Sequence, residues 1–167
     1  KDVPLLYIKI KRKAMMHTWF ECKVRYEKMM ENGVNKKVTE PYLVDALSFT
    51  EAEARIIELI TPYISGEFTV SDIKRAKYSE IFTSEEESAD RWFKSKLIFI
   101  TLDEKSGAEK KSPTQVLVQA ADLRDAVHKI DEGMKGSLAD YQISSVAETP
   151  IIDIFPFHAE ETPKTEE

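Results

Sequence analysis

The side chains best suited to bind a ligand are basic and aromatic, and they gather in two stretches of the first half of the chain. One stretch is "ECKVRY" at residues 21–26, and the other is "IKRAKYSE" at residues 73–80. Cations beside aromatic rings on a sheet are typical of single-strand nucleic-acid binding, because phosphates contact the cations and bases stack on the rings. The candidate nucleic-acid-binding residues are Lys23, Arg25, Lys74, Arg75, Lys77 and Tyr78.

The same basic residues also fit a purely structural role. Lys and Arg on exposed strands discourage edge-to-edge aggregation, and the neighbouring acids Glu21, Asp72 and Glu80 dilute the basic patch. Two interpretations therefore stay open. In the first, the protein binds single-stranded DNA or RNA. In the second, it binds a protein or a small ligand, without nucleic acid, at a groove between repeats or at a sheet edge.

Enzymatic chemistry has few candidate residues in this chain. Cys22 is its only thiol, which excludes an internal disulfide and a multi-cysteine metal site, and its place in an alternating strand predicts a buried side chain. His17, His128 and His158 share no metal-ligand spacing. The chain contains no phosphate-cradling glycine loop and no recognisable catalytic motif. We therefore expect a protein that is not an enzyme and that has no metal and no cofactor.

Composition places the chain among ordinary globular proteins. Of its 167 residues, 42% are hydrophobic and 32% are charged, with a net charge of −6. Overall acidity argues against coating nucleic acid through bulk charge, although it allows a local basic patch. No apolar run approaches the roughly 20 residues of a membrane helix, so we expect a cytoplasmic protein without membrane contact.

The two halves of the sequence resemble each other. Trp19-Phe20 aligns with Trp92-Phe93, 73 residues further on, and Leu43-Val44 aligns with Leu117-Val118, 74 residues further on. The ordered series of matches, interrupted only at turns, predicts an internal duplication. Trp19 and Trp92 are then expected to be packing or interface residues and not ligand-binding residues.

Each half carries the same order of local signals. Alternating apolar residues from Phe20 to Tyr26 predict a half-buried strand, and Asn32-Gly33 and Ser106-Gly107 predict turns to a second strand. Helices are expected to begin at Ser48 and at Asp122, because each is followed three residues later by an acid. The expected apolar stripes of the helices are Ala52, Ile56 and Leu59 in the first half, and Ala126, Val127, Ile130 and Met134 in the second.

A third extended segment closes each half, at residues 67–82 and 140–155. Both are longer than a usual strand, so a break is expected, in the second half near Pro150. The halves differ within these segments. Ala147, Glu148, Pro150 and Ile151 replace Lys74, Arg75, Lys77 and Tyr78, and Ile98 replaces Arg25. The basic residues of the first half are therefore not required by the shared fold, which favours a role in binding.

The sequence predicts an α+β fold, built by tandem duplication of a strand-strand-helix-strand unit. Antiparallel sheets are expected, each packed by one helix, with pseudo-twofold symmetry. The expected segments are an N-terminal extension at 1–15, a first repeat at 16–83, an acidic linker at 84–90, a second repeat at 91–157 and a disordered acidic tail at 158–167. Unpaired sheet edges are also compatible with a homodimer.

Three stretches carry a resemblance to a known family: "MHTWFECKVRYEKMMENG", "KKVTEPYLVDALSFTEAEARIIE" and "ISGEFTVSDIKRAKYSEIF". They resemble a family of small uncharacterised proteins from Bacteroidetes and their phages, known as a domain of unknown function. The resemblance covers residues 16–157 and implies no activity, cofactor or catalytic residue. It also suggests that the natural chain begins near Met15 or Met16, so that residues 1–15 are an upstream extension.

Overall fold

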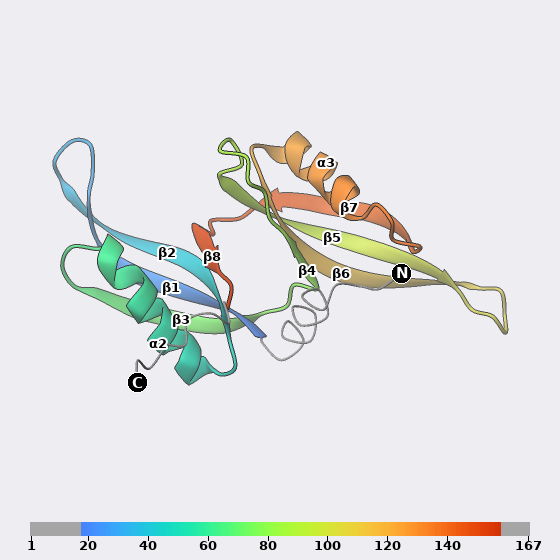
Figure 1. Ribbon diagram of the computed structural model, residues 1–167, viewed down its shortest axis with the longest axis horizontal. Helices are drawn as coiled ribbons and strands as arrows, with labels where there is room; N and C mark the ends of the chain where they lie inside the picture. The colour runs from blue at the N-terminus through green and yellow to red at the C-terminus, as the bar shows by residue number, and fades with distance from the viewer. Residues whose placement is uncertain (1–17, 158–167) are drawn as a thin grey trace, which may run out of the picture. The chain divides into compact units, whose positions relative to one another are not determined.

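The computed structural model describes residues 18–157, which form two compact units (Figure 1). The expected N-terminal extension and acidic tail, together with His17 and His158, lie outside the described residues. Each unit consists of a four-stranded sheet and one α-helix packed on it. The predicted α+β class is confirmed.

The first unit comprises residues 18–76 and 153–157 of the described chain. Its long strands are β1 (Thr18–Met29), β2 (Asn35–Ala46) and β3 (Phe68–Ala76), which pair antiparallel. Helix α2 (Phe49–Ile60) and the short 3-10 turn η1 (Thr61–Tyr63) connect β2 to β3. The short strand β8 (Asp153–Phe155) runs parallel to β2 and gives the order β3-β1-β2-β8.

The second unit is continuous in sequence, from residue 77 to residue 152. It begins with the short strand β4 (Glu80–Phe82), followed by β5 (Arg91–Leu102) and β6 (Glu109–Ala120). Helix α3 (Leu123–Gly133) and strand β7 (Asp140–Glu148) complete it. The strand order is β4-β6-β5-β7, and β4 runs parallel to β6.

The two sheets agree in register, residue by residue. Phe20 lies opposite Arg75 in the first sheet, and Phe93 lies opposite Glu148 in the second, at matched positions. Both sheets also contain the same β-bulge. It leaves Ser71 as the extra residue of β3 and Ser144 as the extra residue of β7. The structure is thus compatible with the predicted duplication down to a local irregularity.

The apolar faces of the helices define two cores. In the first, α2 buries Ala52, Ile56 and Ile60 against β1 and β2, and in the second, α3 buries Ala126 and Ile130. The predicted stripes need two corrections. Leu59 is only half-buried because Ile60 faces the sheet in its place, and Val127 is exposed. The tryptophans also differ, since Trp92 is 3% exposed whereas Trp19 is half-buried.

The helix starts and the turns lie where the sequence placed them. The Ser48 hydroxyl accepts a hydrogen bond from the Glu51 N–H at 3.1 Å, and the Asp122 carboxylate accepts one from the Asp125 N–H at 2.8 Å. Each capping interaction satisfies an N–H group that has no partner inside the helix. Gly33, in the first predicted turn, has a φ of 77°, a conformation that glycine adopts without strain.

Both long extended segments break, as predicted, and the short strand after each break joins the other repeat's sheet. After β3 ends at Ala76, β4 pairs with β6, and after β7 ends at Glu148, β8 pairs with β2 (Figure 1). Phe82 lies opposite Val118, and Phe155 lies opposite Val44, so the two short strands dock in the same register. The sequence repeats therefore differ from the compact units by one strand each.

A glycine at the end of α3 makes room for β4. A Cβ atom at Gly133 would lie 2.6 Å from two ring carbons of Phe82. In an open helix, alanine is more favourable than glycine by about 1 kcal/mol. Here the added methyl group overpacks a docked aromatic ring, which costs about 1–3 kcal/mol.

We therefore expect Gly133→Ala to lower the free energy of unfolding by on the order of 1 kcal/mol, in opposition to its helix propensity. Urea denaturation followed by circular dichroism measures this difference. The control is His128→Ala, on the exposed side of the same helix, which should leave stability unchanged or raise it. If Gly133→Ala is more stable than the wild type by the full helix-propensity difference of about 1 kcal/mol, Phe82 does not pack tightly against α3.

Candidate functional site

The alternation of side chains along β1 sorts the candidate residues between two faces of the first sheet. Phe20, Cys22 and Val24 pack in the core with α2. Because successive side chains of a strand point to opposite faces, Lys23 and Arg25 lie on the opposite face, with Trp19 and Glu21. We call this side of the first sheet, away from α2, the helix-free face.

Cross-strand pairing adds further cations to the helix-free face. Lys74 of β3 lies opposite Glu21, and Lys37 of β2 lies opposite Glu27. Directly opposed residues share a face. Lys23, Arg25 and Lys74 are therefore on one face, as the nucleic-acid hypothesis requires. Lys37 was not among the residues predicted for the site. The Asn32-Gly33 turn could have indicated it, because that turn pairs the strand that carries Lys37 with β1.

Lys74 is engaged within the sheet. Its Nζ atom lies 3.1 Å from Oε2 of Glu21, whose side chain is only 16% exposed. The Lys74 side chain is 60% exposed, so this ion pair contributes little to stability, at most about 1 kcal/mol. It does neutralise the Lys74 charge locally, which leaves Lys23, Arg25 and Lys37 as the main cations of the face.

The other three predicted residues do not join this group. Arg75 lies opposite Phe20, on the helix side of the sheet, with its guanidinium carbon 5.7 Å from the centre of the Phe49 ring. Lys77 and Tyr78 follow the end of β3 and belong to the second unit. Strand alternation explains why the neighbours Lys74 and Arg75 separate.

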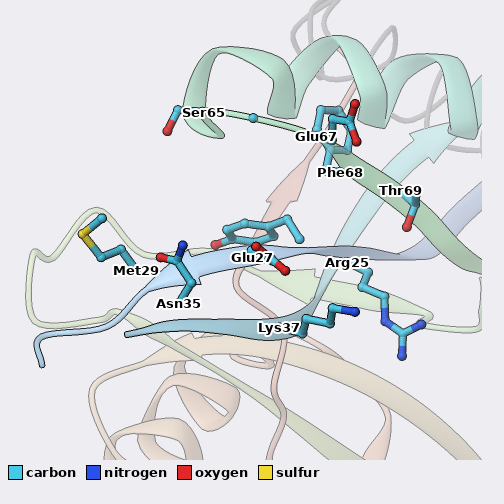
Figure 2. A pocket seen from close by; sticks show the side chains of 11 residues that line it. Arg25, Glu27, Met29, Asn35, Lys37, Ser65, Glu67, Phe68 and Thr69 are labelled. Atoms are coloured by element: carbon cyan, nitrogen blue, oxygen red, sulfur yellow. The ribbon is translucent and has the colours of Figure 1, made fainter. Parts of the chain in front are cut away.

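An open hollow of about 830 Å³ lies at the end of the first sheet, where β1 extends beyond the start of β3 (Figure 2). Arg25 and Lys37 project from the sheet on the side away from the helix, whereas Phe68 and Glu67 lie towards the helix. The lining thus combines two cations with the rings of Tyr26 and Phe68. Glu27 and Glu67 add acidic groups, so the hollow has no single sign of charge.

A tyrosine–glutamate network fixes the helix side of this end of the sheet. Glu40 accepts hydrogen bonds from the hydroxyls of Tyr26 and Tyr42, each at 3.0 Å. Burial, followed by the hydrogen bond to Glu40, raises the pKa of Tyr26 to about 12. Burial and the charge of Glu40 also raise the pKa of Tyr42. Both phenols therefore remain hydrogen-bond donors at neutral pH, and the network is structural.

Cys22 is the buried small residue that its strand pattern predicted. Its side chain is 0% exposed, and its counterpart Ser95 donates a hydrogen bond to the Ser145 carbonyl at 2.8 Å. Burial, reinforced by the charges of Glu21 and Asp72, raises the pKa of the Cys22 thiol to about 12. A thiol with so high a pKa is not a nucleophile at neutral pH.

The described part of the chain contains neither a cluster of metal-ligating side chains nor a helix that could span a membrane. Between residues 18 and 157, no three His, Cys, Asp or Glu side chains are grouped so as to hold a metal ion. Over the same residues, no helix is long and apolar enough to cross a membrane.

A family profile described as Domain of unknown function (DUF4494) matches residues 18–157. The chain belongs to this family. The match spans both repeats, both sheets and the two short strands β4 and β8. No curated protein matches the chain.

The raised pKa of Cys22 makes the stability of the first unit depend on alkaline pH. In the unfolded chain the thiol ionises near its ordinary pKa of 9.0, whereas in the folded chain it stays protonated up to about pH 12. The stabilisation is therefore complete below pH 9.0 and is lost progressively towards pH 12. Cys22→Ser removes this titration, and the serine hydroxyl has a precedent in Ser95.

We expect wild type to lose about 1 kcal/mol more stability than Cys22→Ser between pH 8 and pH 10. Urea denaturation at both pH values measures the difference, and the change common to both proteins cancels. Equal pH dependence in the two proteins would show that the thiol is accessible to water. Rapid labelling of folded wild type by iodoacetamide would show the same.

Proposed function

We propose that this protein is a non-enzymatic binding protein that contacts single-stranded DNA or RNA through the helix-free face of its first sheet. The observation that carries the proposal is the convergence of Lys23, Arg25 and Lys37 on that face. Arg25 and Lys37 are exposed, and Lys23 is half-buried. Among residues 18–157, no ion pair includes any of these three side chains.

The arrangement of these cations suits an extended phosphate backbone. Lys23 and Arg25 alternate along β1 and so lie about 7 Å apart. Lys37 enters from the neighbouring strand, two rows further along. Arg25 can hold a phosphate with two parallel hydrogen bonds. Trp19 lies in the same row of β1 and is half-buried.

The acidic residues on this face limit the strength of binding. Glu27 lies opposite Lys37, and Asp72 lies opposite Lys23. Each carboxylate lowers the local positive potential that attracts phosphate. We therefore expect weak binding that is lost as salt is added, because salt competes with the protein for the phosphates.

The second repeat supplies a matched control. Lys94 and Lys96 occupy the β5 positions that correspond to Glu21 and Lys23, and both are exposed. The position that corresponds to Arg25 holds Ile98. Reversing both lysines changes the net charge of the protein by the same amount as reversing Lys23 and Arg25, but does so outside the proposed site.

Fluorescence polarisation with labelled single-stranded DNA and RNA tests the proposal. For three phosphate contacts, the logarithm of the affinity should fall against the logarithm of salt concentration with a slope of about −2. The double variant K23E/R25E should bind at least about tenfold more weakly than wild type, since two charge-assisted contacts are lost. The control K94E/K96E should stay within about twofold of wild type.

Two results would contradict the proposed function. One is the absence of binding by wild type at low salt. The other is an equal loss of affinity in K23E/R25E and in K94E/K96E, which would indicate bulk charge and not a site. Circular dichroism of both variants checks that each remains folded.

A second candidate function is the capture of an extended protein segment at the outer edge of β7. This strand of nine residues pairs only with β5 among the described strands. Its interior, residues 141–147, carries no charged side chain, whereas the corresponding strand β3 carries Asp72, Lys74 and Arg75. Edge strands without charges are suited to β-strand addition.

Gln142→Lys places a protective charge on the β7 edge, where the side chain is exposed. If β7 captures a protein, this variant should lose a partner that copurifies with wild type after nuclease treatment, as detected by mass spectrometry. The matched control is Thr69→Lys on β3. Thr69 lies opposite Arg25, and Gln142 lies opposite Ile98, which is the counterpart of Arg25. This control variant should retain the partner. Retention by both variants would contradict this second function.

A further inference from the structure

The first unit is completed by a strand from the far end of the described chain. The second unit is continuous in sequence, and its own first strand, β4, covers the edge of β6. The first unit has no such preceding strand among the described residues, and β8 covers the edge of β2 in its place. We call the edge of β2 and the adjoining side of α2 the acceptor groove.

Ring stacking on Tyr42 and the side chain of Arg55 hold β8 and the residues after it in the acceptor groove. The Phe155 ring stacks on Tyr42, with 5.9 Å between ring centres and 25° between ring planes. Arg55, from α2, donates a hydrogen bond to the Pro156 carbonyl at 3.5 Å, and its guanidinium carbon lies 5.5 Å from the centre of the Phe157 ring. Arg55 also donates to the Asp45 carbonyl, which anchors the arginine to β2.

The second unit shows the same arrangement with different residues. Lys129, at the position of Arg55, contacts the Ser84 hydroxyl at 3.2 Å and Glu86 at 3.1 Å, both just after β4. Gly133 makes room for Phe82 on α3, whereas α2 has Leu59 at that position. The expected acidic linker therefore contacts the helix of its own unit. The two grooves take similar strands but are not interchangeable.

The contacts in the acceptor groove do not depend on which chain supplies β8. The strand is only three residues long, and residues 149–152 connect it to β7. Directly after β7, the N–H and the hydroxyl of Thr149 both donate hydrogen bonds to the Trp92 carbonyl, at 2.8 Å and 2.9 Å. The segment that must change course for β8 to reach another molecule is therefore short and contains Pro150.

We propose that the acceptor groove binds β8 of a second copy of this chain, so that two copies exchange β8 reciprocally in a closed dimer. The same bonds form in monomer and dimer, so the balance between them depends on effective concentration, which is on the order of millimolar for a short linker. The partner is a second copy because the groove already fits the residues of β8 and those that follow it, Asp-Ile-Phe-Pro-Phe.

A peptide of residues 149–157, TPIIDIFPF, tests docking from a separate molecule. The full chain with Phe155→Ala serves as the acceptor, because its own β8 has lost the ring that stacks on Tyr42. Labelled peptide should bind this variant at least about tenfold more tightly than it binds wild type, whose groove is occupied. The peptide TPIIDIAPF should not bind either protein. No binding of TPIIDIFPF to the variant would overturn the proposal.

A second experiment does not depend on the folding of that variant. Wild type is refolded from urea at increasing protein concentration, and the dimer fraction is measured by size exclusion with light scattering. The dimer fraction should rise with concentration during refolding, and excess TPIIDIFPF should reduce it. The control variant is Phe82→Ala, which makes the corresponding change in β4 of the second unit. This variant should still form the dimer. A wild-type protein that stays monomeric even when it is refolded at about millimolar concentration, or a dimer that the peptide leaves intact, would overturn the proposal.

Discussion

The pairing of β8 with β2 is the interaction on which the first unit depends. Three residues of β8 pair with Tyr42, Leu43 and Val44, which are all buried, and Phe155 packs on the core next to Tyr42. A sheet edge left open there would expose unpaired backbone groups beside apolar side chains. Val44 and Phe155 are far apart in sequence, but the entropic cost of bringing two segments together grows only slowly with the length of chain between them.

The same principle explains why the two repeats are alike in register but different in detail. Shared features, such as the bulges at Ser71 and Ser144, preserve the twist that each sheet needs to pack on its helix. Two of the differences between the repeats lie where a strand docks or where a surface is exposed. Gly133 accommodates Phe82, and Arg25 replaces an apolar residue on the helix-free face.

Local patterns allowed much of this fold to be predicted from the sequence. The alternation of apolar and polar residues predicted β1, and the capping residues Ser48 and Asp122 predicted where the helices begin. Pro150 indicated the break between β7 and β8. Pairing between distant segments was not predictable in this way. Alternation along β3 does separate Lys74 from Arg75, but no local signal shows that β8 joins β2, or that Glu21 and Phe49 are the residues that Lys74 and Arg75 contact. Of the six predicted residues, Lys23, Arg25 and Lys74 share the helix-free face, together with Lys37.

Hydrogen exchange of the full chain, compared between wild type and Phe155→Ala, tests the central claim most directly. If β8 completes the first unit, the variant should lose protection at the amides of β2 around residues 42–46, while the amides of β5 and β6 keep theirs. Unchanged protection of β2 in the variant would contradict the account, because the first sheet would then be stable without its closing strand.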